Sequence, residues 1–281
     1  MKRTLKLLII LTLMTAATAT ATAQEVKAIS FNIRYNGVQA QREDGKHIWA
    51  NRRDAVIKML ENEDADIIGM QEALLDQLSY IDRYFIKKYR RVGVGRDNGL
   101  TRGEHNVIYF NAERFQLISQ KTRWLSPTPR RVSLGWDAAC IRIVTIAHLR
   151  HKATGRDLYY FNTHLDHVGD ISRRESVELI AKLIAEEVPA GAALLVGGDM
   201  NSNVNEPLFD PLRKAGLEVA RDIAPRTDYR STFNAFGKSR GKMIDHFFVR
   251  NVEMVRFHTI LRSYGVAYLS DHYPIEIIFN L

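Results

Sequence analysis

The chain has 281 residues, of which 46% are hydrophobic and 26% are charged, and its formal net charge is +8. This composition is typical of a globular protein with a substantial core, and it excludes disordered and collagen-like proteins. The single cysteine, Cys140, excludes a disulfide framework and any cysteine-rich zinc or iron–sulfur site. The mild excess of basic residues is compatible with a polyanionic partner.

Residues 1–23 have the pattern of a secretory signal peptide. A short apolar run, residues 7–14, follows three basic residues, and Ala21-Thr22-Ala23 resembles a cleavage site. That run is much shorter than the ~20 apolar residues that a membrane-spanning helix needs. No cysteine lies near the cleavage point to carry a lipid, so we expect a periplasmic or secreted protein with one domain spanning residues 24–281.

Short apolar runs alternate with stretches of helical periodicity along this domain. The periodicity predicts helices near residues 49–60, 74–81 and 172–186, and Ser172 with Glu175 has the pattern of a capping box. Strands interleaved with helices predict a mixed α/β fold. The apolar runs predict strands at Val26–Phe31, Asp66–Met70, Val107–Phe110, Ile141–Ala147, Leu158–Asn162, Ala193–Gly197, Phe247–Val249 and Ile275–Phe279.

Six of these apolar runs adjoin a carboxylate, an amide or an imidazole. Taken singly, each polar cluster is typical of a turn or a surface loop. A sheet edge that collects acids and histidines from several strands can instead assemble one functional site. The residues concerned are Asn32, Glu72, His164, Asp199, Asn201, Asp245, Asp271 and His272.

The chemistry of these side chains indicates a metal-assisted reaction. Oxygen ligands dominate and sulfur is missing, which favours Mg²⁺ or Mn²⁺ over zinc. Carboxylates gathered in one cleft repel one another unless a cation lies among them. A histidine beside a carboxylate can act as a general base for water near neutral pH. We therefore expect metal-assisted hydrolysis of a phosphate ester.

Six motifs in order make the sequence resemble the endonuclease/exonuclease/phosphatase superfamily, which includes deoxyribonuclease I. The resemblance implies a two-layer sandwich of mostly antiparallel sheets flanked by helices, with four layers in the order α/β/β/α. Two further stretches, residues 49–53 and 93–97, are similar to secreted bacterial members without an agreed substrate. The six motifs are Ser30-Phe31-Asn32-Ile33-Arg34, Gly69-Met70-Gln71-Glu72, Asn162-Thr163-His164-Leu165-Asp166, Gly198-Asp199-Met200-Asn201, Ile244-Asp245-His246-Phe247-Phe248 and Ser270-Asp271-His272-Tyr273-Pro274.

The resemblance also implies where a metal ion and the attacking water are handled. Asn32, Glu72 and Asp271 are expected at the metal ion, which is Mg²⁺ or Mn²⁺. His272 is expected to act as the base that prepares the water, with Asp245 hydrogen-bonded to its imidazole.

The remaining matched residues are implied to handle the phosphate and the leaving group. Asp199 is expected either to orient the nucleophile or to assist protonation of the leaving group, and Asn201 to hold a phosphoryl oxygen. His164 is expected to bind the phosphate or to assist its departure. Glu104, just before a predicted strand, is a candidate partner for His164, although it also fits an exposed loop.

Two other groups of residues are candidate components of the site. His164 and His167 could suggest a di-zinc centre, but the pattern H-x-H-x-D-H is not met because residue 162 is asparagine. His167 is therefore expected to be a loop residue near the pocket. The aromatic residues Trp49, Trp124, Trp136 and Tyr229 fit a substrate cleft and a core position equally well.

The favoured hypothesis is a secreted, metal-dependent phosphoesterase that acts, as a monomer, on a small or glycan-linked phosphate ester. An extracellular nuclease is the alternative, but the basic residues are scattered and form no stripe with interleaved aromatics. A sphingomyelinase-like role would need an apolar membrane-docking hairpin, and none is evident, so no stable membrane insertion is expected. A degenerate binding module is disfavoured because the matched residues are all present.

Overall fold

The computed structural model describes residues 24–281, and the predicted signal peptide lies outside the described residues. Two six-stranded sheets pack face to face, with strand orders β11-β12-β1-β2-β4-β3 and β5-β6-β7-β8-β10-β9. The strands are β1 Glu25–Asn32, β2 Ile67–Ala73, β3 Tyr89–Val92, β4 His105–Asn111, β5 Phe115–Trp124, β6 Ile143–His151, β7 Asp157–His164, β8 Ala193–Asp199, β9 Glu218–Val219, β10 Asp245–Arg250, β11 Glu253–Thr259 and β12 Ile275–Asn280.

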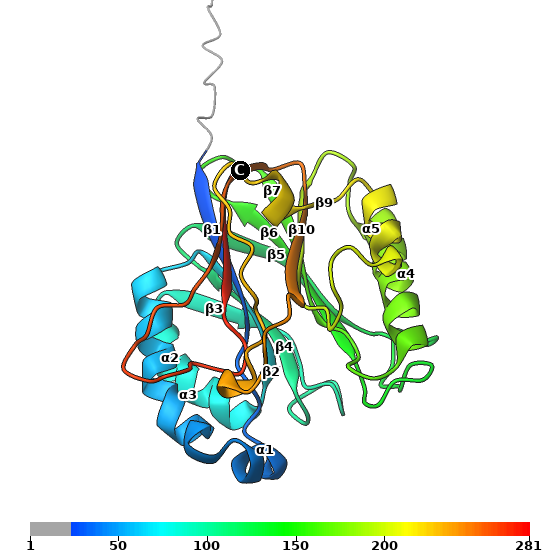
Figure 1. Cartoon of the computed structure of the whole chain (residues 1–281). Coiled ribbons are helices and arrows are strands. Elements are labelled where there is room, and N and C mark those ends of the chain that lie inside the picture. The colour runs from blue at the N-terminus through cyan, green and yellow to red at the C-terminus, as the bar shows by residue number, and fades with distance from the viewer. Residues whose placement is uncertain (1–23) are drawn as a thin grey trace, which may run out of the picture.

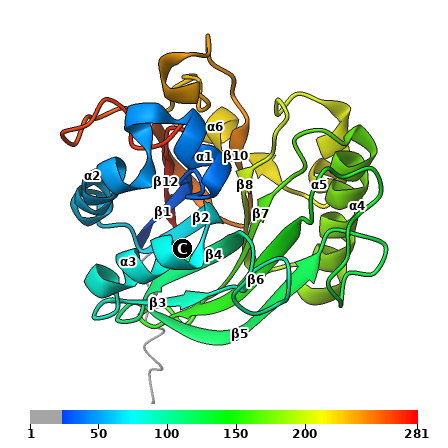
Figure 2. The same cartoon turned by 90° about the horizontal axis from the view of Figure 1, so that it is seen from below.

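Helices cover the outer faces of both sheets, which confirms the predicted four-layer α/β/β/α sandwich. In Figure 1, α2 and α3 lie on the side of the first sheet and α4 and α5 on the side of the second. Figure 2 shows the same order of layers from below. The α-helices are α1 Val38–Glu43, α2 Trp49–Glu63, α3 Leu75–Phe85, α4 Asp170–Glu187, α5 Asp210–Lys214 and α6 Ala220–Ile223, with short 3-10 turns at Gly45–His47, Pro207–Phe209 and Ala235–Gly237.

Three apolar layers hold the sandwich together. One lies between the sheets and includes Ile67, Leu149 and Phe279. The second packs α2 and α3 on the first sheet, and the third packs α4 and α5 on the second. The inner strands of both sheets are covered on each face. Their sequences are therefore continuously apolar and do not alternate between apolar and polar residues.

Parallel pairing at the centre of each sheet decides where the polar strand ends meet. Most neighbours are antiparallel, but β1 pairs with β2 and β7 pairs with β8 in parallel. Parallel strands end at the same edge, so Asn32 lies in register with Gln71, and His164 with Asp199. The antiparallel β10 begins at that edge, where Asp245 pairs with Asp199. The α1 segment marks this end of the molecule in Figure 1.

All eight predicted strands are present, and the four that the sequence did not reveal share one property. β3, β5, β9 and β11 are the edge strands of the two sheets. An edge strand is partly exposed and can carry polar side chains. In β5, for example, residues 116–123 are all exposed or half-buried, so no apolar run indicates a strand.

The predicted capping box at Ser172 is not formed. Helix α4 begins at Asp170, and the cap residue Gly169 has no side chain to accept a hydrogen bond. The carboxylate of Asp137, from a distant loop, accepts instead from the backbone N–H groups of Ile171 and Ser172, at 3.2 and 2.6 Å. A contact with a distant residue thus satisfies the N–H groups at the start of the helix, in place of the predicted capping box.

The close approach of β8 to β7 requires glycine at position 198, where φ is +144°. A Cβ atom there would lie 1.8 Å from the carbonyl oxygen of Thr163. We expect Gly198→Ala to lower the free energy of unfolding by about 2–4 kcal/mol, because the backbone must move. Gly191→Ala is the control, since its Cβ would meet no atom within 4 Å. Denaturant unfolding measures both; equal stability of the two variants would contradict this account.

Candidate functional site

The amide of Asn32 links the two sheets at the polar edge. Its Nδ2 donates to Glu72 Oε1 at 2.8 Å and to Asp199 Oδ2 at 2.9 Å, while its Oδ1 accepts from the backbone N–H of Arg34 at 3.0 Å. Asn32 is fully buried. Asn32, predicted at the metal, positions two carboxylates, and its Oδ1 accepts one hydrogen bond and keeps a second lone pair.

His272 lies between two buried carboxylates. Its Nδ1 is 2.9 Å from Asp245 Oδ2, the pair that the resemblance implies, and its Nε2 is 3.6 Å from Asp199 Oδ2. Burial lowers the pKa of His272, but the charges of Asp245 and Asp199 outweigh that effect and raise it well above its usual value. In turn, burial first, and then Asp245, raise the pKa of Asp199 to about 7.

His164 faces Asp199 from the other side. Its Nε2 lies 3.0 Å from Asn201 Nδ2 and 3.4 Å from Asp199 Oδ2, while its Nδ1 is buried without a partner among the described residues. Asn201 also donates to the carbonyl of Leu165 at 3.0 Å, so its side chain is held in place. Burial and the nearby charge of Arg142 lower the pKa of His164, which keeps the imidazole neutral.

Glu104 does not pair with His164 as the sequence suggested. Its Oε2 accepts from Arg96 Nη1 at 2.8 Å, and no hydrogen bond joins it to His164 within residues 24–281. The physical reason is charge: a guanidinium attracts a carboxylate more strongly than a neutral imidazole does. Glu104 nevertheless lines the same cavity as His164.

The backbone is strained where three site residues lie. Arg34, Glu72 and Asn201 have φ values of +56°, +62° and +49°, a region that non-glycine residues rarely adopt. The turn at Glu72 lets its Oε2 accept from the backbone N–H of Tyr35 at 3.0 Å. Such strain gathers at functional sites, where the surrounding structure imposes it.

The donor set fits a divalent cation. Glu72, His164 and Asp199 each offer a ligand atom within 4.8 Å of the others. Asp271 lines the same cavity, 3.8 Å from Arg34, and burial followed by the charge of Glu72 raises its pKa. Burial is the main cause of the raised pKa values of Asp199 and Asp271, and a neighbouring carboxylate adds to it, whereas Arg34 lowers the pKa of Glu72. A cation among these acids would stabilise their charged forms.

The site opens into a cavity of about 560 Å³. Seven of the nine predicted site residues line it, and Asn32 and Asp245 lie buried behind them. The sequence assigned no role to several other lining residues, among them Arg34, Tyr35, Arg96 and Arg142. None of the four weighed aromatic residues lines this cavity; Trp49 and Trp124 are buried and Tyr229 is exposed.

Comparisons with known proteins agree with this geometry. The Endonuclease/Exonuclease/phosphatase family model matches residues 29–272, so the chain belongs to that family and is a phosphoester hydrolase. Among solved structures, a family protein from Bacteroides vulgatus is 32% identical, with a TM-score of 0.85, and the match covers 92% of this chain and 99% of that one.

Two further relatives extend the comparison. A mannosyl-6-phosphatase from Bacteroides thetaiotaomicron is 29% identical, with a TM-score of 0.83, covering 90% of this chain and 99% of that one. An uncharacterised protein of Acanthamoeba polyphaga mimivirus is 28% identical, and the match covers 83% of this chain and 92% of that protein.

Within residues 24–281, no helix is long and apolar enough to span a membrane.

A buried arginine supports the site from behind. Arg52 is 1% exposed and donates to four carbonyl groups, including those of Ile33, Arg34 and Leu269. Burial lowers its pKa to about 10, and within residues 24–281 no carboxylate forms an ion pair with it. It therefore ties the loop after Asn32 to the segment that leads to Asp271.

We expect Arg52→Gln to lower the free energy of unfolding by about 2–4 kcal/mol, because buried carbonyl groups lose their donors. Arg53→Gln is the matched control: the neighbouring side chain is exposed, and its loss is expected to cost less than about 1 kcal/mol. Urea unfolding at neutral pH measures both variants. If Arg53→Gln proved as destabilising as Arg52→Gln, the assigned role of Arg52 would be wrong.

Proposed function

We propose that the protein is a secreted, Mg²⁺- or Mn²⁺-dependent phosphoesterase that hydrolyses a phosphate ester by in-line attack of water. The observation that carries this proposal is the buried His272, held at Nδ1 by Asp245 and facing Asp199 through Nε2. The substrate is a phosphodiester or a sugar or lipid phosphomonoester. The mannosyl-6-phosphatase relative supports the sugar-phosphate class.

His272 takes the proton from water at Nε2. When the imidazole is neutral, its Nδ1–H donates to Asp245, which leaves the lone pair of Nε2 free for that proton. Asp199, 3.6 Å from Nε2, lies where it can orient the same water. The P–O bond to the leaving alcohol breaks as the new P–O bond forms.

Other side chains hold the phosphoryl group and the cation. Asn201 would hold a phosphoryl oxygen once one of its amide hydrogens leaves His164 or Leu165, and the neutral His164 beside it binds the phosphate or assists the departing group. Asn32, Glu72 and Asp271 would hold the ion, and Asn32 also fixes the carboxylate of Glu72. When bound, Mg²⁺ or Mn²⁺ polarises the phosphoryl oxygen and offsets its growing negative charge.

Replacing His272 by alanine should lower kcat on the order of 10²–10⁴-fold, because the general base is removed. Hydrolysis of 4-nitrophenyl phosphate and bis(4-nitrophenyl) phosphate with Mg²⁺ or Mn²⁺ measures this. His258→Ala is the control, since His258 is an exposed residue of β11 and should keep wild-type turnover. Unchanged turnover of His272→Ala on both esters would sink the mechanism.

Cation binding should be visible without turnover. In EDTA, the carboxylates around His272 keep its pKa raised, so the imidazole stays protonated above pH 6.5. Adding Mg²⁺ offsets their charge and should lower that pKa, as histidine NMR titration can follow. Glu72→Gln should abolish the shift, whereas Glu61→Gln, on the exposed face of α2, should not. If Mg²⁺ left the pKa of His272 unchanged, a cation site beside His272 would be excluded.

A further inference from the structure

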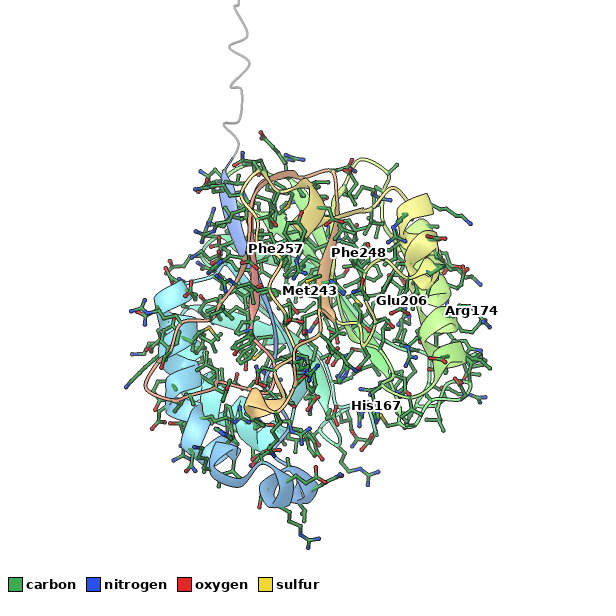
Figure 3. The ribbon with its side chains drawn as sticks, viewed as in Figure 1. His167, Arg174, Glu206, Met243, Phe248 and Phe257 are labelled. Atoms are coloured by element: carbon green, nitrogen blue, oxygen red, sulfur yellow. The ribbon has the colours of Figure 1, made fainter. Side chains whose placement is uncertain are left out.

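The cavity is also lined by two arginines and a histidine that the mechanism above does not use. Arg96, Arg142 and His167 all line the cavity, and we call them the basic wall. Figure 3 labels His167 toward the same end of the molecule as α1, away from the C-terminus. The basic wall comes from three loops: residues 93–104, the segment before β6, and the segment after β7.

Arg142 is buried and locked in position. It is 4% exposed, its Nε donates to Asp166 Oδ2 at 3.2 Å, and its Nη2 lies 3.0 Å from His167 Nδ1. Asp166 also accepts from the backbone N–H groups of Val168 and Gly169, at 3.0 and 2.8 Å. The carboxylate is thus rigid, and the guanidinium that it holds has little freedom to turn away.

The remaining nitrogen of Arg142 is available to a ligand. Within residues 24–281, Nη1 of Arg142 has no hydrogen-bond partner, and this atom is not fully shielded from solvent. Burying a guanidinium is costly unless its donors are used. A donor left free at the wall of a substrate cavity is therefore a recognition group for an anion.

Strand register brings Arg142 close to the residues that handle phosphate. Val144 of β6 pairs with Thr163 of β7, so Arg142, two residues earlier, lies alongside the segment that follows His164. The hydroxyl of Thr163 donates to the carbonyl of Ile143 at 3.1 Å, which fixes that register. Arg142 therefore faces the same end of the cavity as His164.

Arg96 is fixed in a similar manner on its own loop. Its Nη1 donates to Glu104 at 2.8 Å, and its carbonyl accepts from the indole of Trp124 at 2.8 Å. This ion pair explains the position of Glu104, whose carboxylate holds the guanidinium of Arg96 at the basic wall. Asp97 also lies 3.8 Å from Nε of Arg96, so carboxylates hold both arginines that border the cavity.

We propose that the basic wall, through Arg142, binds a peripheral oxygen of a terminal phosphate and makes the enzyme selective for phosphate monoesters over diesters. This inference rests on the proposed phosphoesterase function and narrows its substrate class. A monoester dianion presents three peripheral oxygens, whereas a diester has an organic group in place of one of them. That group would leave the buried guanidinium without a partner. Water then converts the monoester and releases one alcohol and one inorganic phosphate.

Kinetics on a matched pair of substrates tests the selectivity. We expect Arg142→Gln to lower kcat/KM for 4-nitrophenyl phosphate on the order of 10- to 100-fold more than for bis(4-nitrophenyl) phosphate. Arg142→Lys should fall in between, since it keeps the charge but loses the planar fork. Arg150→Gln is the control, because Arg150 on β6 is exposed and pairs with Asp157. An equal loss on both substrates overturns the inference.

Binding separates this inference from the proposed function. Calorimetry with inorganic phosphate and with dimethyl phosphate, on the full mature chain with Mg²⁺, needs no turnover. Arg142→Gln and Arg96→Gln should weaken phosphate binding while the weak binding of dimethyl phosphate changes less. Unweakened phosphate binding by a folded Arg142→Gln, checked by its Tm, overturns the inference even if the enzyme is active. A wild-type protein that binds phosphate through Arg142 but hydrolyses neither ester overturns the proposed function alone.

Discussion

The buried carboxylate of Asp199 is the contact on which the site depends. It accepts from Asn32 of the opposite sheet and lies 3.4 Å from His164 and 3.6 Å from His272. Asp199 ends a central strand whose parallel partner and antiparallel partner both meet it in register. Because both sheets converge on this one side chain, a shift of either sheet would separate the groups that the chemistry needs.

Concentrating acids at this point creates an electrostatic problem that the chain resolves with cations. Burial raises the pKa of Asp199 and of Asp271, so each acid holds a proton more readily than an exposed one. A divalent cation can replace those protons. Arg96 and Arg142, which line the same cavity, form ion pairs with Glu104 and Asp166, and Nη1 of Arg142 is left for an anionic substrate.

The inner strands and most of the site residues could be predicted from the sequence, but the edge strands could not. Inner strands are buried on both faces and produce continuous apolar runs, whereas the edge strands β3, β5, β9 and β11 do not. Ser172 matched a capping pattern, yet Asp137 caps the helix from 35 residues away. Local patterns predict local structure, and a competing tertiary donor or acceptor can replace them.

The sequence by itself determined the inner strands, through apolar periodicity, and the family and the residue types at the strand ends, through six motifs of four or five adjacent residues. The sandwich was implied by the resemblance to that family. Only the tertiary structure decided the pairing of those side chains. Glu104 contacts Arg96 rather than His164, Asn32 joins Glu72 to Asp199, and Arg142 is locked by Asp166. Such contacts depend on strand register and on the paths of loops that cross the sheet edge, and no neighbouring residue encodes them.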